Sequence, residues 1–384
     1  MKFEFATATR IVFGRGRFAE IGQLAASFGK SALIVTGKSL QRAQPLVEQL
    51  RRAGVANSVF SITGEPKVTD VRIGTERAKA AQCELVIGFG GGSAIDCGKA
   101  IAAMLTNSGD VLDHLEVVGK GQAIAEPAAP FIAIPTTAGA GAEVTKNAVL
   151  MSPEHSVKAS MRSVLMLPRV ALVDPELTIG LPPEITAATG MDALTQVIEP
   201  YTCCRSNPLT DALCRDAIPR IARSLKGAFE NGKDLDARED MALGSLLGGL
   251  ALANSGLGAV HGFAAPLGGM FPAPHGAVCA ALLPPVMEAN LKALRERYAE
   301  SEIIGRYEEI ARWLTQNHDA TAEDGVDWIS RLGSDLSIPP LREYGISKGD
   351  LPDLVQKAAA ASSMKANPLP LTETELDGIV RRVW

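Results

Sequence analysis

Two of the five histidines in this 384-residue chain frame an apolar, proline-broken stretch, HGFAAPLGGMFPAPHG, which runs from His261 to Gly276. Upstream, in TGMDALTQVIEPY, Asp192 and Gln196 are four residues apart and share one face of a predicted helix. Imidazole and carboxylate groups suit iron and zinc, and such an ion polarises an alcohol or carbonyl oxygen. Asp192, His261 and His275 are therefore predicted to bind a divalent metal. The alternative is that the histidines are only hydrogen-bonded in loops.

A glycine-rich turn, GGGS, joins a predicted strand to a predicted helix. Glycines let the backbone approach a phosphate closely, and a helix N-terminus attracts an anion. Gly91, Gly92 and Ser93 are therefore predicted to contact the phosphates of a nucleotide, against the alternative of a purely structural turn. Ser93 and Asp96 also fit a capping box, which predicts a structural role for Asp96.

The turn after the first predicted strand offers no carboxylate to a ribose 2′-hydroxyl. It contains Gly37, Lys38 and Ser39 instead, so a 2′-phosphate could be accommodated there. These residues favour NADP(H) over NAD(H). The alternative for Lys38 is a solvated surface lysine.

The loop PTTAGAGAEVT, residues 135–145, directly follows another predicted strand. Thr136 and Thr137 supply hydroxyls, and the loop is predicted to form a second wall for the same elongated ligand. Lys158 follows in a strand-like run and could pair with a phosphate or a ribose, although such a lysine is more often a surface charge.

Short apolar runs alternate with helical stretches in the first half of the chain. The predicted strands cover residues 31–36, 58–62, 84–89, 131–134 and 170–173, and the predicted helices cover residues 40–52, 70–83 and a stretch that ends near 104. Apolar strands separated by helices are typical of a parallel sheet that is covered on both faces. Residues 1–178 are therefore predicted to form a dinucleotide-binding α/β domain.

Strand-like runs disappear after Asp174-Pro175, and residues 179–384 are predicted to form an all-α metal and substrate domain. Breaks are predicted at Pro182-Pro183, Pro284-Pro285 and Pro339-Pro340. The uncharged stretch Met241–Val260 is long enough to cross a bilayer. Its five glycines favour a buried helical segment instead, because small residues allow close helix packing.

The bulk composition predicts a globular protein with no nucleic-acid or membrane partner. Hydrophobic residues make up 46% and charged residues 21%, and the net charge of −5 comes with no basic block. Six cysteines without a CxxC pair favour a reduced, cytoplasmic protein. The N-terminal MKFEFATATR has no apolar core, so no signal peptide is predicted.

The motifs and their order resemble those of the iron-containing (group III) alcohol dehydrogenases over nearly the whole chain. In chain order they are GGGS, PTTAGAGAEVT, DPELT with LPP, GMDALTQVIE and HG…PHG. The resemblance implies a homodimer that exchanges hydride between an alcohol and NAD(P). It places Ser93, Thr136 and Lys158 against the cofactor and Leu177 near the nicotinamide. Gly37 falls where many NAD-using members carry an aspartate.

The chain departs from the family pattern at three places. Gln196 stands where members have a third histidine ligand, and the resemblance implies that its oxygen completes the metal site with Asp192, His261 and His275. Ala265 stands where many members have a further histidine, and the cofactor loop lacks two hydroxyls. Beyond the metal ligands, no catalytic residue is assigned. The departures leave alternatives open: a metal-independent reductase of the maleylacetate-reductase type, a lyase resembling dehydroquinate synthase, and a non-catalytic nucleotide-binding protein.

Overall fold

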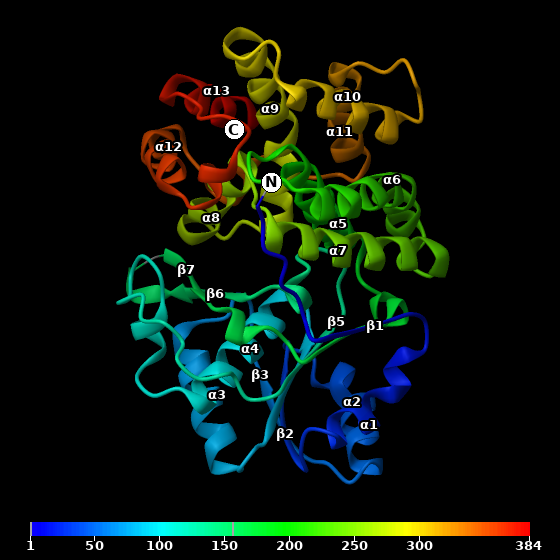
Figure 1. The fold of residues 1–384 in the computed structure, drawn as a ribbon, viewed down its shortest axis with the longest axis vertical. Coiled ribbons are helices and arrows are strands. Elements are labelled where there is room, and N and C mark those ends of the chain that lie inside the picture. The colour runs from blue at the N-terminus through cyan, green and yellow to red at the C-terminus, as the bar shows by residue number, and fades with distance from the viewer. Residues whose placement is uncertain (1, 156) are drawn as a thin grey trace. The chain divides into compact units, whose positions relative to one another are not determined.

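The chain folds into two compact units, which a computed structural model describes over residues 2–155 and 157–384. One unit comprises residues 5–137 and 141–178, and the other comprises residues 2–4, 138–140 and 179–384. The first unit contains a parallel sheet covered by helices, and the second is built from helices (Figure 1). The predicted fold class is confirmed.

The α/β unit is organised around a six-stranded parallel sheet with the order β1-β8-β5-β4-β2-β3. Its strands are β1 (Arg10–Phe13), β2 (Ser31–Thr36), β3 (Ala56–Ser61), β4 (Leu85–Gly90), β5 (Phe131–Pro135) and β8 (Val170–Val173). A separate antiparallel pair is formed by β6 (Asn147–Ser152) and β7 (Val157–Arg162). Strands β4, β5 and β8 are buried along their whole length, as expected where both faces of a sheet are covered.

Alternate residues of the central strands pack against different helices, because successive side chains of a strand point to opposite faces. Leu33 and Val35 join the core formed with α3 (Val68–Ala80) and α4 (Gly92–Thr106). Their neighbour Ile34 joins the core formed with α1 (Ile21–Ala26) and α2 (Leu40–Arg52). Figure 1 shows these two helix pairs on opposite sides of the sheet.

The register of the sheet brings the ends of three central strands to the same edge. Thr36 of β2 pairs with Phe89 of β4, and Gly90 of β4 pairs with Pro135 of β5. The turns that follow these strands are the three segments predicted to contact a nucleotide. Ligands of open parallel sheets bind at this carboxyl edge.

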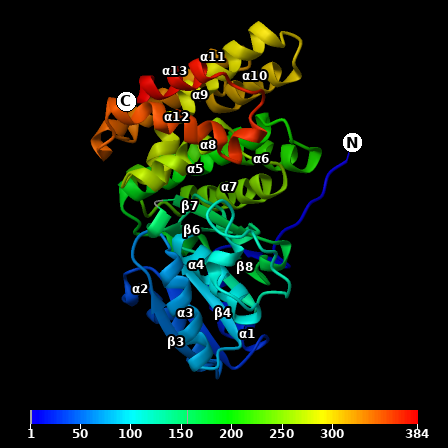
Figure 2. The ribbon, with the colours of Figure 1, turned by 90° about the vertical axis from the view of Figure 1, so that its left-hand side faces the viewer.

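The helical unit is centred on α5, which packs against α6, α7 and α9 and is buried over most of its length (Figure 2). Its helices are α5 (Pro183–Thr202), α6 (Pro208–Glu230), α7 (Leu235–Asn254), α8 (Ala259–Met270), α9 (His275–Arg297), α10 (Glu302–Thr315), α11 (Ala322–Asp335), α12 (Leu351–Ala360) and α13 (Glu373–Val383). One apolar core links them. The helices therefore hold their polar side chains in fixed positions.

Two predictions about breaks in this unit have different outcomes. Helix α5 begins at Pro183, as predicted, because proline is compatible with the first turn of a helix. The break predicted at Pro284-Pro285 is wrong, since both prolines lie inside α9. Burial of this long apolar helix compensates for the backbone hydrogen bonds that the prolines remove.

The uncharged stretch Met241–Val260 is not one continuous helix. It belongs to α7 and α8, which are bent by 97° relative to each other at the break after Asn254. By length and composition, α9 is the one unbroken described helix that could cross a membrane, but 72% of its most apolar window is buried inside the protein. The core helix of a globular protein has the same properties.

Candidate metal centre and nucleotide-binding edge

Three helices of the helical unit bring together the predicted metal ligands. Asp192 and Gln196 lie one turn apart on α5, His261 lies in the first turn of α8, and His275 begins α9. Asp192 Oδ1 is 3.6 Å from Nε2 of His261 and 3.5 Å from Nε2 of His275. The centroids of the two imidazole rings are 5.3 Å apart. Asp192 therefore converges with two histidines that lie 69 and 83 positions later in the chain.

A cysteine that the sequence analysis missed completes this cluster. Cys279 lies on α9, four residues after His275, so that both side chains share one helix face. One possible ligand atom from each of Asp192, His261, His275 and Cys279 lies within 4.8 Å of the others. The four-residue spacing of His275 and Cys279 is the one local signal of this proximity in the sequence.

The cluster presents buried acceptors that nothing in the described chain satisfies. Asp192 Oδ1 and Gln196 Oε1 are both buried and have no hydrogen-bond partner. Unpaired buried acceptors are costly and usually indicate an ion or another group at the site. A divalent cation would satisfy the carboxylate, so the residues present fit a metal ion.

The electrostatics of the cluster also favour positive charge. Burial raises the pKa of Asp192, but the charges of His275 and His261 outweigh burial and lower the pKa to about 2. Burial lowers the pKa of His261, but the acidic groups around it, Glu199 among them, outweigh burial and raise that pKa well above its ordinary value. A buried carboxylate that stays ionised beside imidazoles is suited to hold a cation.

Glu199, also not identified from the sequence, supports His261 from behind. Its Oε2 accepts a hydrogen bond from His261 Nδ1 at 2.6 Å, and its Oε1 accepts one from the backbone N–H of Val260 at 2.7 Å. When His261 is neutral, the first bond keeps the ring proton on Nδ1, so that Nε2, which is turned toward Asp192, can bind a metal. Carboxylate–histidine pairs of this kind orient metal ligands in proteins.

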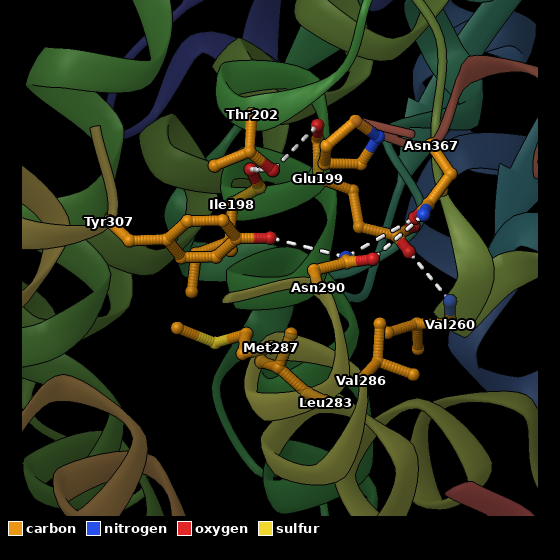
Figure 3. A pocket seen from close by; sticks show the side chains of 12 residues that line it. Ile198, Glu199, Thr202, Val260, Leu283, Val286, Met287, Asn290, Tyr307 and Asn367 are labelled. Carbon is orange, nitrogen blue, oxygen red and sulfur yellow. Dashed lines mark hydrogen bonds between the residues drawn. The ribbon is translucent and has the colours of Figure 1, made fainter. Parts of the chain in front are cut away.

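A second buried polar network lies beside Glu199 (Figure 3). Asn367 accepts a hydrogen bond from the N–H of Ala259 at 3.0 Å and donates one to Asn290 Oδ1 at 2.7 Å. Asn290 in turn donates a hydrogen bond to the hydroxyl of Tyr307 at 3.2 Å. The network borders a cavity of about 10 Å³, which is the size of one water position. These bonds fix the first turn of α8 and, with it, the position of His261.

The glycine after each histidine is explained by close packing. A Cβ atom on Gly276 would lie 2.0 Å from the carbonyl oxygen of Ala188 on α5, and one on Gly262 would lie 2.8 Å from Met364 Cε. Only glycine allows α9 to approach α5 so closely at this point. Gly276 therefore lets α9, which carries His275, converge on α5, whereas Gly262 meets only the flexible end of Met364.

At the carboxyl edge of the sheet, the three predicted nucleotide-binding turns adjoin one another. A Cβ on Gly90 would lie 3.7 Å from the backbone nitrogen of Gly37, and one on Gly91 would lie 3.4 Å from Thr137 Oγ1. The backbone N–H of Thr136 donates to the carbonyl of Gly90 at 2.9 Å. Segments 53 and 46 positions apart in the chain thus form one continuous edge, suited to an elongated ligand.

Helix α4 begins directly at this edge, with Gly91 as its N-cap and Gly92 as its first residue. No side chain caps it, so its amide dipole faces the edge and favours an anion. The capping box predicted for Ser93 and Asp96 is wrong, because the helix begins before Ser93. Asp96 instead accepts a hydrogen bond from the N–H of Val149 at 3.0 Å, which is a structural role.

The remaining predicted nucleotide-binding residues lie in several places of the α/β unit. Lys38 and Ser39 are exposed after β2, next to Gly37. Leu177 packs against the core of the sheet, and its carbonyl accepts a hydrogen bond from Arg42 of α2 at 3.2 Å. Lys158 is largely buried and forms an ion pair with Glu65 at 2.8 Å. Its ammonium therefore already has a partner within the protein.

Comparison with known families identifies both halves of the chain. Residues 8–175 match the family model described as iron-containing alcohol dehydrogenase. Residues 186–384 match the C-terminal model of the Fe-containing alcohol dehydrogenase family. The two matches correspond to the α/β part and the helical part of the fold.

Individual relatives cover the whole chain. The chain is 37% identical to a 1,3-propanediol dehydrogenase of Klebsiella pneumoniae, with 100% of this chain and 99% of that protein covered. It is 33% identical to an NAD-dependent methanol dehydrogenase of Bacillus methanolicus, with 96% and 97% covered. A solved 1,3-propanediol oxidoreductase superposes with a TM-score of 0.93 at 36% identity, with 100% of each chain covered. The chain therefore belongs to the iron-containing alcohol dehydrogenase family and is an NAD(P)-dependent oxidoreductase that interconverts an alcohol and a carbonyl compound.

Proposed function

We propose that this oxidoreductase works with a divalent iron or zinc ion held in the helical unit by Asp192, His261 and His275, with Gln196 beside them. The observation that supports this most strongly is the buried, unpaired Oδ1 of Asp192. This oxygen lies 3.6 Å from Nε2 of His261 and 3.5 Å from Nε2 of His275. When bound, the ion would polarise the substrate oxygen, and the nicotinamide would carry the hydride.

The protein's own part in this reaction is to hold its ligands in place and to keep their charges paired. Glu199 fixes the tautomer of His261, and the packing of Gly276 against α5 fixes the first turn of α9. Ala265, at the position where many relatives carry another histidine, is exposed and has no group that moves a proton. We assign the proton of the reaction to water or to the cofactor ribose.

For the cofactor, we propose that Gly37, Lys38 and Ser39 receive the adenosine ribose and that Gly91, Gly92 and Ser93 receive the phosphates. Thr136 and Thr137 form the neighbouring wall, with Lys158 and Leu177 farther along the ligand. The absence of a carboxylate between Thr36 and Leu40 supports a preference for NADP(H). One relative is named as NAD-dependent, so the preference needs a direct measurement.

The substrate is proposed to be a small alcohol or aldehyde, and the enzyme is proposed to act as a cytoplasmic homodimer. Oxidation of NADPH and of NADH should be followed separately by absorbance with a panel of short-chain aldehydes. We expect a higher kcat/KM with NADPH. We also expect His275→Ala to lose activity with both cofactors while it still binds NADPH. Equal activity of the variant would refute the metal-dependent reaction, and a higher kcat/KM with NADH would refute the cofactor preference.

A further inference from the structure

Cys279 faces the candidate metal site, although the reaction described above does not use it. Its side chain is fully buried. Its Sγ lies 3.7 Å from Nε2 of His275 and 4.0 Å from Nε2 of His261. These are the same two nitrogens that approach Asp192 Oδ1.

The separations match those of atoms that share one tetrahedral ion. With zinc–nitrogen and zinc–oxygen bonds of about 2.1 Å and zinc–sulfur bonds of about 2.3 Å, neighbouring ligand atoms lie about 3.4–3.6 Å apart. The four separations of 3.5, 3.6, 3.7 and 4.0 Å exceed these values by at most a few tenths of an ångström, and the two remaining pairs of ligand atoms lie within 4.8 Å of each other. Side-chain adjustments within this cluster would therefore bring all four atoms onto one ion.

Gln196 is a weaker candidate for the fourth position. Its oxygen is neutral and is a poorer donor to zinc or iron than a thiolate. The unpaired Oε1 of Gln196 remains free to accept a hydrogen bond from water or from a substrate hydroxyl.

The ordinary explanation of a buried cysteine is that it packs as a small apolar residue. Cys97 and Cys214 fit that explanation, since both lie in hydrophobic clusters and neither belongs to the group of possible metal ligands found among the described residues. Cys279 also touches the core, but it differs from them because two imidazole nitrogens and an unpaired carboxylate oxygen surround the same point.

We propose that Cys279 supplies a thiolate as the fourth protein ligand, so that the site has an Asp, two His and one Cys. This inference rests on the proposed metal-dependent function, and it departs from the one-Asp, three-His set that the family resemblance implies. On binding, the sulfur donates an electron pair to the ion and the thiol proton passes to water. Because thiolate is a soft ligand, the set selects zinc over manganese or magnesium.

The direct test is X-ray absorption at the zinc edge of the full-length protein reconstituted with zinc. We expect one sulfur neighbour at about 2.3 Å together with nitrogen and oxygen neighbours. This measurement needs no variant. A zinc shell with nitrogen and oxygen alone would overturn the proposal, as would a protein that binds no metal.

Cobalt(II) replacement provides a second readout that is independent of activity. The wild-type protein should show a thiolate-to-cobalt charge-transfer band, Cys279→Ser should lose that band, and the matched control Cys214→Ser should keep it. Cys279→Ser should also lower zinc affinity by about 100-fold or more, with a much smaller change for manganese. Retention of the band in Cys279→Ser would overturn the proposal. A wild-type protein that shows the band but transfers no hydride would refute the proposed function and leave the thiolate ligand established.

Discussion

Replacing Glu199 with glutamine tests whether the support behind His261 is needed for metal binding. Glu199 accepts two hydrogen bonds, from His261 Nδ1 at 2.6 Å and from the backbone N–H of Val260 at 2.7 Å. Glutamine has nearly the same shape, but it offers one acceptor and one donor. In either orientation, one of the two hydrogen bonds cannot form as it does in the wild-type protein.

The consequence depends on which way the glutamine amide turns. If its NH₂ group faces Val260, two buried donors oppose each other, which costs about 1–3 kcal/mol of folding free energy. If it faces His261, the imidazole must accept at Nδ1 and carry its proton on Nε2, which then points at Asp192 and cannot bind a metal. Changes of this kind typically lower metal affinity by about 10- to 100-fold, or about 1.4–2.7 kcal/mol.

The assay is a competition titration in which the protein and a chromophoric chelator share zinc, with the Tm of the metal-free protein measured in parallel. Glu309→Gln is the matched control, because it makes the same chemical change elsewhere in the helical unit, where Glu309 accepts a hydrogen bond from Tyr201. The control should bind zinc as the wild type does. A zinc affinity of Glu199→Gln within about twofold of wild type would refute the orienting role, since it is far smaller than the expected loss.

Four further predictions follow from packing and charge. Gly276→Ala should destabilise the protein by about 3 kcal/mol, because the added Cβ would lie 2.0 Å from a backbone oxygen. The Tm and the zinc affinity should fall together, and an unchanged Tm would contradict this packing argument. Burial raises the pKa of Glu143 from 4.5 to about 7. The protonated side chain therefore contributes about 3 kcal/mol to the free energy of unfolding below pH 4.5, and this contribution is lost as the pH rises to 7. Denaturant titrations of Glu143→Gln should not show that loss, and a parallel loss in both proteins would contradict the assignment. Lys99→Met should destabilise the α/β unit by about 3 kcal/mol and raise the KM for the cofactor. The reason is that the buried ammonium donates hydrogen bonds to the carbonyls of Ala142 and Asn147 at the Thr-rich loop. A variant of normal stability would contradict this role of Lys99. Gly37→Asp should lower the ratio of kcat/KM with NADPH to kcat/KM with NADH by about tenfold or more, because a carboxylate there favours a ribose 2′-hydroxyl over a 2′-phosphate. No atom lies within 4 Å of the added Cβ, so the side chain has room. An unchanged ratio would place the ribose elsewhere.

Local sequence patterns predicted the sheet and its helices well where the elements are buried. The predicted bounds of β2, α2 and β8 agree with the structure, since apolar runs and turn residues mark their ends. Strand β1 was missed because Arg10–Phe13 is short, lies at the sheet edge and is partly exposed. The break predicted within α9 failed because its prolines lie in a helix that tertiary burial stabilises.

The candidate metal centre was predictable only in part. Asp192 and Gln196 were paired by helix spacing and the histidines by their glycines, but no local pattern shows that α5, α8 and α9 meet at one point. Glu199 and Cys279 acquire their roles only through that meeting. The sequence could show that these two residues share helix faces with predicted ligands, but it could not show what those faces contact.

The most direct test of the metal-dependent reaction is the metal content of the protein purified anaerobically without chelators, measured by mass spectrometry beside its NADPH-dependent aldehyde reduction. We predict about one iron or zinc ion per chain, loss of activity when a chelator removes it, and recovery when it is added back. Asp192→Asn should contain no metal and show no activity. A metal-free protein that still oxidises NADPH with an aldehyde would contradict the account and leave His261 and His275 as hydrogen-bonding groups.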